Sequence, residues 1–134
     1  MAAPAWDIDD AGVRELLALP RDGRYASFLQ HTADWEEVWG LKDDNGWIVR
    51  GGDSDDEAFP LWPHAAFATL CARGPWEGTV PERISLDDLV EDLLPLLEDD
   101  AIAVEVFPTQ DDRGTLVAAR QLLQDLQREL ELGE

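Results

Sequence analysis

The sequence contains one cysteine, one lysine and one tyrosine, and these scarcities exclude several kinds of protein. A single thiol, Cys71, excludes an internal disulfide framework and is typical of a cytoplasmic protein. No apolar run approaches the roughly 18–20 residues that a membrane-spanning helix needs. The first residues have neither the basic nor the apolar region of a secretory signal. We therefore expect a cytoplasmic protein that does not associate with membranes.

Basic residues are also scarce: 10 lysines and arginines stand against 30 aspartates and glutamates, for a formal net charge of −20. Such a surface repels nucleic-acid phosphates and anionic lipids. We expect no direct nucleic-acid binding, and the partner that this charge favours is a basic protein. Hydrophobic residues make up 45% of the 134 residues, which is enough for a core. The length predicts one domain over residues 1–134.

Sequence motifs that carry known chemistry are missing too. There is no G-x-S-x-G elbow, phosphate-binding loop or dinucleotide fingerprint. His31, His64 and Cys71 lack the clustered spacing of a zinc site. The acidic run at residues 53–57 fails the calcium-loop pattern at its glycine and glutamate positions. We therefore predict no catalytic residue set, no cofactor and no metal.

Four segments show apolar residues at helical spacing. The first follows a capping acid at Asp9 or Asp10 and ends at Pro20, and the second runs over residues 22–32. The third follows Ser85 as N-cap and is ended or kinked by Pro95. The fourth covers residues 119–130. A further short helix is expected after residue 62, with Pro63 in its first turn.

Strand signals lie between these helices. The stretch "EEVWGLKDDNGWIVRGG" predicts a hairpin that turns at Asn45-Gly46, with Trp39 and Trp47 paired across the strands. Short strands are also expected in "AFPLW", "AIAVEVF" and "TLVA". Together these segments predict an α+β fold, in which helices pack against a small, mostly antiparallel sheet.

Three stretches resemble the bacterial family catalogued as domain of unknown function 2750: "RYASFLQHTADWEEVWGLKDDNGW", "FPLWPHAAFATLCARGPWEG" and "ISLDDLVEDLLPLLEDDAIAVEVFP". The resemblance covers about residues 20–130 and leaves residues 1–19 as a helical extension outside the pattern. It implies a compact bacterial domain and brings no activity with it. The positions that carry it are Arg24, Tyr25, Trp39, Leu41, Gly46, Trp47, Pro60, Trp62, Pro63, His64, Phe67, Ala68, Trp76, Ser85, Leu86, Val106, Phe107 and Pro108.

Our first functional hypothesis is a non-enzymatic interaction module, similar to an immunity protein or regulator, that binds a basic partner. The acidic loop formed by Asp53, Asp55, Asp56 and Glu57 is its expected binding edge. If this loop binds, neutralising its four acids slows association and flattens the salt dependence of the rate.

Two alternatives stay open. The first is a small-molecule or enzymatic site built around Trp62 and His64, in which an imidazole lies beside an arginine and aromatic walls. Its remaining members are Arg24, Tyr25 and Trp39. The second alternative is a nucleic-acid mimic, whose ordered carboxylates imitate phosphates and occupy a DNA-binding protein.

Overall fold

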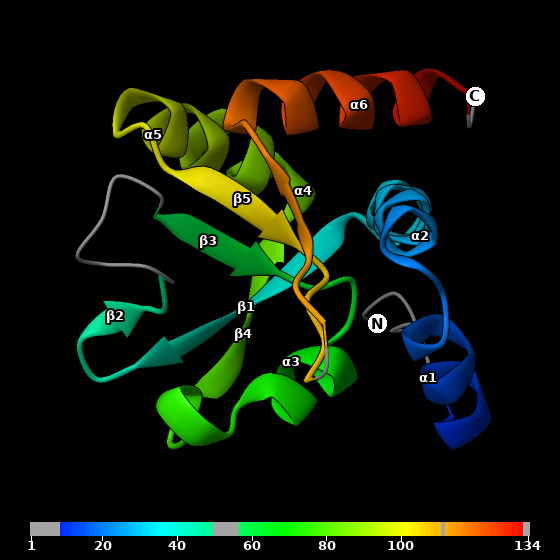
Figure 1. Cartoon of the computed structure of the whole chain (residues 1–134). Helices are drawn as coiled ribbons and strands as arrows, with labels where there is room; N and C mark the ends of the chain where they lie inside the picture. The colour runs from blue at the N-terminus through cyan, green and yellow to red at the C-terminus, as the bar shows by residue number, and fades with distance from the viewer. Residues whose placement is uncertain (1–8, 50–56, 111, 133–134) are drawn as a thin grey trace, which may run out of the picture.

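The structure is a computed structural model that describes residues 9–49, 57–110 and 112–132 (Figure 1). Over these residues the fold is α+β, as the sequence predicts. The helical elements are α1 (Asp10–Leu17), α2 (Arg21–Trp35), α3 (Ala65–Cys71), the 3₁₀ turn η1 (Gly74–Trp76), α4 (Leu86–Asp88), the π-helical turn η2 (Leu89–Leu93), α5 (Leu94–Asp99) and α6 (Ala119–Leu132). The strands are β1 (Glu37–Asp43), β2 (Gly46–Trp47), β3 (Ala58–Leu61), β4 (Val80–Ser85), β5 (Ala103–Val106) and β6 (Thr115–Val117).

The strands form two three-stranded sheets rather than one. The first has the order β2-β1-β4 and is antiparallel, and the second has the order β3-β5-β6. In the second sheet β3 and β5 are parallel, whereas β5 and β6 are antiparallel. Trp39 and Trp62 join the sheets, because each backbone N–H donates to the other's carbonyl at 2.8 Å. Antiparallel pairing therefore predominates among the described strands, with one parallel pair that the sequence did not predict.

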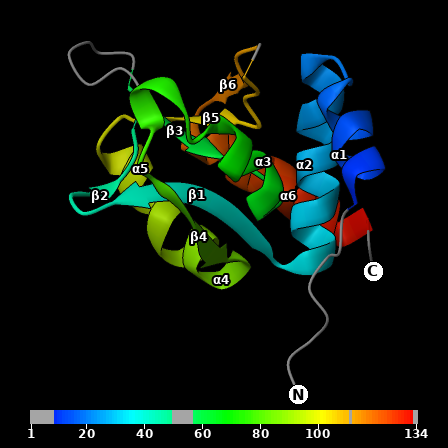
Figure 2. The ribbon, with the colours of Figure 1, turned by 90° about the horizontal axis from the view of Figure 1, so that it is seen from below.

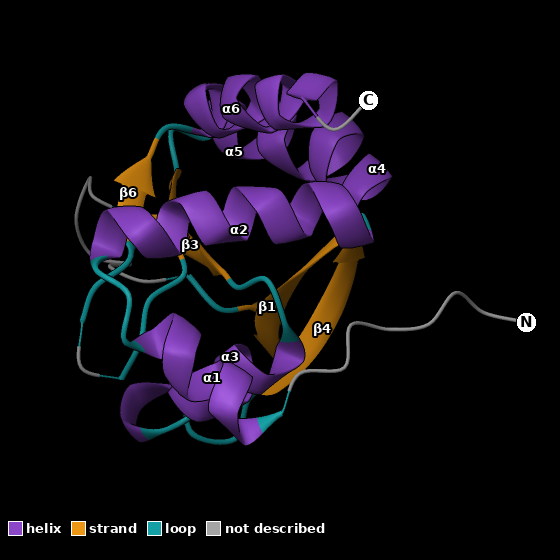
Figure 3. Cartoon of the chain, turned by 90° about the vertical axis from the view of Figure 1, so that its right-hand side faces the viewer, coloured by secondary structure: helices purple, strands orange, loops and turns teal. Residues whose placement is uncertain are grey.

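Helices cover the first sheet on both faces. The α3 helix contacts β1 and β4 on one face, and the continuous helical segment over residues 86–99 lies on the other (Figure 2). The α2 helix crosses between α5 and α6 on one side and α1 and α3 on the other (Figure 3). These packings bury a core that is continuous between the sheets. Its largest fully buried side chains are Trp62, Phe28, Phe67, Phe107, Leu41, Leu61, Leu89, Leu94, Leu122 and Leu126.

The helix boundaries follow the expected capping in two cases and differ in two. The side chain of Asp9 accepts from Gly12 N–H at the start of α1, and Ser85 caps the segment that begins at Leu86. Pro63 lies before α3, and His64 is its N-cap instead. Of the two outcomes expected at Pro95, an end or a kink, the end is wrong, because α5 continues through this residue to Asp99. The helix is irregular just before Pro95, where the π-helical turn over Leu89–Leu93 leads into α5.

The predicted hairpin is present, but its tip lies one residue earlier than expected. Asp43 pairs with Gly46, so the two-residue turn is Asp44-Asn45, and Gly46 takes the positive φ of 115°. Trp47 pairs with Lys42, which places it on the sheet face opposite Trp39. The expected Trp39–Trp47 pair is therefore wrong. The partner of Trp47 is Lys42, which lies three residues from Trp39 on β1, and an odd separation along a strand places two side chains on opposite faces.

Candidate functional site

An acidic surface covers the helical segment over residues 86–99 and the turn residue Asp100 that follows it. Seven exposed carboxylates and no basic residue lie along it: Asp87, Asp88, Glu91, Asp92, Glu98, Asp99 and Asp100. In the described part of the chain one of the seven forms an ion pair, between Glu98 and Arg120 at 2.9 Å. The first acids lie at the positive end of the helix dipole, where they stabilise the helix start. Asp87 and Glu91, and likewise Asp88 and Asp92, lie four residues apart and repel each other, a cost that a positive partner would relieve.

A groove of about 330 Å³ runs between this acidic surface and the hairpin. Asp88, Asp92 and Leu96 follow one another at four-residue spacing and so form one side of it. Leu96 is 55% exposed, one of the largest exposures of any large apolar side chain in the described residues. We call this feature the Trp47–Leu96 groove. The residues that line it are Trp47, Arg83, Ile84, Asp88, Asp92, Leu93 and Leu96.

Trp47 is held in the groove wall by its neighbours on the sheet. Its ring lies across Gly40, where an added Cβ would meet the indole at 3.0 Å. Phe59 packs against the ring with 5.7 Å between centroids, and the Lys42 ammonium lies 5.1 Å from the ring centroid. Glycine at position 40 therefore makes room for an aromatic wall at the edge of the sheet. The wall is preorganised, so little side-chain freedom is lost when something binds against it.

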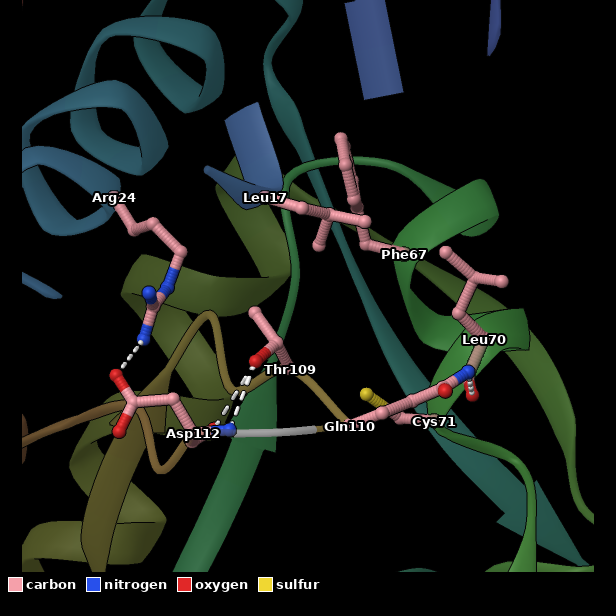
Figure 4. Close-up of a pocket in the computed structure, with 8 residues that line it drawn as sticks. All are labelled: Leu17, Arg24, Phe67, Leu70, Cys71, Thr109, Gln110 and Asp112. Carbon is pink, nitrogen blue, oxygen red and sulfur yellow. Dashed lines mark hydrogen bonds and ion pairs between the residues drawn. The ribbon is translucent and has the colours of Figure 1, made fainter. Parts of the chain in front are cut away.

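A second cavity, of about 270 Å³, lies at the carboxyl edge of the parallel β3–β5 pair (Figure 4). The α3 helix follows β3, the 107–114 loop follows β5, and both contribute side chains to the cavity. The residues that line this carboxyl-edge pocket are Leu17, Arg24, Phe67, Leu70, Cys71, Thr109, Gln110 and Asp112. Leucine and phenylalanine side chains make one wall, and Arg24 and Asp112 face each other on another.

Arg24 ties the 107–114 loop to α2. Its side chain is 4% exposed, and its guanidinium donates to the carbonyls of Leu19, Phe107 and Arg113 at 3.0–3.1 Å. Nη2 also donates to Asp112 Oδ2 at 2.9 Å. Burying a guanidinium is costly unless its N–H groups find partners, and these contacts supply partners for four of the five. The loop conformation is therefore set by a residue more than 80 positions away.

Other contacts hold the same loop. The carbonyl of Pro108 accepts from Trp62 Nε1 at 2.8 Å and lies 3.5 Å from Cys71 Sγ. Gln110 Nε2 donates to the Leu70 carbonyl at 2.6 Å. Phe107 takes a left-handed φ of 58°, an uncommon conformation for a bulky residue that a well-held loop maintains. These contacts hold the described residues on both sides of position 111 in place at the pocket floor.

Asp112 links two arginines on the pocket rim. Its carboxylate accepts from Arg21 at 2.8 Å and from Arg24 at 2.9 Å. The hydrogen bonds from Arg21 and then Arg24 lower the pKa of Asp112 from 3.8 to about 2. The carboxylate therefore stays ionised at every physiological pH.

The structure distributes the sequence-predicted site residues over several places. Arg24 lines the carboxyl-edge pocket, and Trp62 is fully buried behind it, against Trp76 at 6.1 Å between ring centroids. The Nδ1 atom of His64 accepts from Ala66 N–H at 3.0 Å. Tyr25 donates from its hydroxyl to Asp125 on α6.

Trp39 donates from Nε1 to Glu37 at 3.1 Å, on the opposite face of the first sheet from the Trp47–Leu96 groove. Of the acidic loop, Asp53, Asp55 and Asp56 lie outside the described residues. Glu57 is half-buried, and its carbonyl accepts from Ala103 N–H at 3.1 Å.

Sequence reasoning missed most of both cavities. It singled out neither Asp112 nor Asp88, because neither lies in a chemical motif. The signal for the pocket was a proline soon after each of two apolar strands, at Pro63 and Pro108. It becomes informative only once the two strands are known to be parallel and adjacent.

The described residues form an α+β fold with two cavities. Residues 25–126 match the family described as "Protein of unknown function (DUF2750)". The chain belongs to that family, as the resemblance in its sequence predicts. No functionally curated protein shows a significant match to the chain.

Among the helices of the described residues, none combines the length and apolarity that crossing a membrane requires. No group of three or more histidine, cysteine, aspartate or glutamate side chains converges on a metal position within the same residues.

Proposed function

We propose that this protein is a non-enzymatic interaction module that binds a basic segment of a partner protein along the acidic surface and the Trp47–Leu96 groove. The observation that carries the proposal is the run of seven exposed carboxylates, unbroken by a basic residue, beside an open apolar groove. The expected binding edge thus moves from the loop at residues 53–57 to the acidic surface over residues 86–100. The setting we propose is the bacterial cytoplasm, in keeping with the single cysteine.

The charge supplies steering and selectivity. A net charge of −20 attracts a positive partner over several ångströms and raises its association rate, an effect that salt screens beyond about 8 Å. Lysine and arginine side chains that reach Asp88 and Asp92 gain Coulomb attraction and relieve the repulsion between these acids. Rim charges of this kind change the association rate and its salt dependence more than the final affinity.

The apolar floor supplies the anchor. Buried aromatic and aliphatic contacts near the centre of an interface carry most of its binding energy. Trp47, Leu93 and Leu96 give the groove lining such apolar surface beside Asp88 and Asp92. The partner segment that fits this pattern places one apolar side chain on the groove floor and basic residues on both sides of it.

The proposal is tested by affinity capture with a matched pair of variants. Asp88→Asn with Asp92→Asn removes two charges at the groove, and Asp34→Asn with Glu131→Gln removes two exposed charges on α2 and α6. The proposal predicts that the captured partner is basic and dissociates as salt rises. It also predicts that the Asp88→Asn, Asp92→Asn variant no longer captures this partner, whereas the Asp34→Asn, Glu131→Gln control still does. A partner captured equally by both variants overturns the proposed surface.

The two other hypotheses have different standing. The small-molecule alternative keeps Arg24 in a cavity, the carboxyl-edge pocket, but without Tyr25 and Trp39. Nucleic-acid mimicry stays a prediction. It requires that the captured basic protein bind DNA and that DNA compete for the acidic surface.

A further inference from the structure

The carboxyl-edge pocket lies where ligands of sheets with parallel strands are commonly bound. The β3 and β5 strands run in parallel, so the chain leaves both at one edge, into α3 and into the 107–114 loop. Crevices beyond the carboxyl ends of parallel strands are preferred ligand sites, because flanking loops diverge there. This position is separate from the Trp47–Leu96 groove, since the two cavities share no lining residue.

The walls of the pocket suit a small molecule with an apolar body. A volume of about 270 Å³ lies at the small end of ligand cavities. Leu17, Phe67 and Leu70 make an apolar wall, and Thr109 lies below it (Figure 4). Ligand pockets commonly combine such a wall with a few fixed polar groups.

The Arg21–Asp112–Arg24 cluster beside the pocket carries a net positive charge in a strongly negative protein, and two of its members, Arg24 and Asp112, line the cavity itself. Arg21 and Arg24 share the single carboxylate of Asp112, which leaves this cluster with a surplus of one positive charge. Of the five N–H groups of Arg24, four have the partners described above, and the fifth is on Nη1. The protein's net negative charge does not prevent an anion from binding here. At physiological salt the repulsion from acids more than about 8 Å away is largely screened, whereas attraction to a partly buried arginine in contact with the anion is screened much less.

We propose that this pocket binds a small organic carboxylate with an apolar body. The body lies against Leu17, Phe67 and Leu70, and the carboxylate lies toward the Arg21–Asp112–Arg24 cluster, where Arg24 supplies its fifth N–H. The loop needs no rearrangement to accept it, because Arg24, Trp62 and Gln110 already fix its backbone. Preorganised sites of this kind lose little affinity to ordering.

The test uses three probes that share a phenyl body and differ in their polar group: phenylacetate, phenethyl alcohol and phenethylamine. Each is titrated into the full chain, and backbone amide shifts are followed by NMR at Thr109, Gln110 and Leu70. Phenylacetate is expected to shift these amides at lower concentration than the alcohol, with the amine weakest. Shifts that are absent, that favour the amine, or that centre on Trp47 instead overturn the proposal.

Two arginine variants separate a local charge effect from a global one. Arg21 and Arg83 both have side chains that are 53% exposed, both form one ion pair, and neither supports the core. Arg21→Gln is expected to weaken phenylacetate about twofold to fivefold, which is the range one exposed charge supplies, and to leave the alcohol unchanged. Arg83→Gln is expected to leave both probes unchanged. Equal weakening by the two variants overturns the assignment to this pocket.

A variant that fills the cavity gives an independent test. Leu70→Trp fills the cavity from its apolar wall and is expected to abolish the phenylacetate shifts at Thr109 and Gln110, and its amide spectrum reports whether it is folded. Retained binding by a folded Leu70→Trp variant contradicts the proposal, and if this variant does not fold the arginine pair decides alone. The basic-partner capture above uses variants on the other cavity, so either proposal can fail without the other.

Discussion

Arg24 Nη2 lies 2.9 Å from Asp112 Oδ2, although 88 residues separate the two in sequence. One partner is buried and the other is 41% exposed, so the pair spans the boundary between the core and the carboxyl-edge pocket. Arg24 also holds three carbonyls, and two of them belong to the loop that carries Asp112. This one side chain therefore couples the position of α2 to the shape of the pocket floor.

We predict that Arg24→Met destabilises the protein by about 2–4 kcal/mol, because it leaves buried carbonyls without their donor. Arg21→Gln, which removes an exposed partner of the same aspartate, is expected to cost at most about 1 kcal/mol. Urea denaturation followed by circular dichroism measures both. Equal costs for the two variants contradict the role assigned to Arg24.

The low pKa of Asp112 predicts an acid-sensitive contribution to stability. Its pKa is about 2 in the folded protein against an ordinary 3.8, because Arg21 and Arg24 donate to the ionised carboxylate. A folded pKa below the unfolded one stabilises the protein above about pH 4, and this contribution fades as the pH falls from about 4 toward 2. The stability gap between the wild type and Asp112→Asn is therefore expected to shrink across this window. Urea midpoints of both proteins, measured between pH 4 and pH 2, test this. A stability difference that stays constant over this range would contradict the role assigned to the Asp112 carboxylate.

Two glycine-to-alanine changes are expected to have opposite signs. At Gly114 an added Cβ would lie 2.4 Å from the Val106 carbonyl oxygen, so Gly114→Ala forces the loop away from β5 and costs about 1–3 kcal/mol or more. At Gly23, in the first turn of α2, the closest contact of an added Cβ is an ordinary 3.4 Å. Gly23→Ala is expected to be neutral or to stabilise by up to about 1 kcal/mol. Thermal melts of both variants test the pair, and a stable Gly114→Ala refutes the tight loop.

The sequence predicted the elements better than their assembly. Apolar spacing identified the helices, and the turn residues at 43–46 identified the hairpin, because both signals are local. The parallel pairing of β3 with β5 joins segments 45 residues apart, with α3, β4 and another helical segment between them. No local pattern encodes such a pairing, so the two strands were expected in a mostly antiparallel sheet.

The candidate sites show the same division. Arg24 was expected beside an imidazole and aromatic walls, and the structure places it in a cavity. The two residues expected beside it are bound elsewhere. Tyr25 donates to Asp125 on α6, and Trp39 donates to Glu37, two residues away on the same strand. Asp112 and Leu96 were not identified, because an acid in a turn and a leucine after a proline are ordinary in sequence. Only the packing of distant elements places them beside a cavity.

The central claim is that the acidic surface binds a basic segment through an apolar anchor in the Trp47–Leu96 groove. The most direct measurement is calorimetric binding of two synthetic peptides, one with a leucine flanked by lysines and arginines and one with glycine in its place. The account predicts that the leucine peptide binds more tightly, that salt weakens both, and that Asp88→Asn with Asp92→Asn weakens both while Asp34→Asn with Glu131→Gln does not. Equal binding of the two peptides, or equal loss with either pair of charge changes, would contradict the claim and reduce the charge to a general property of the surface.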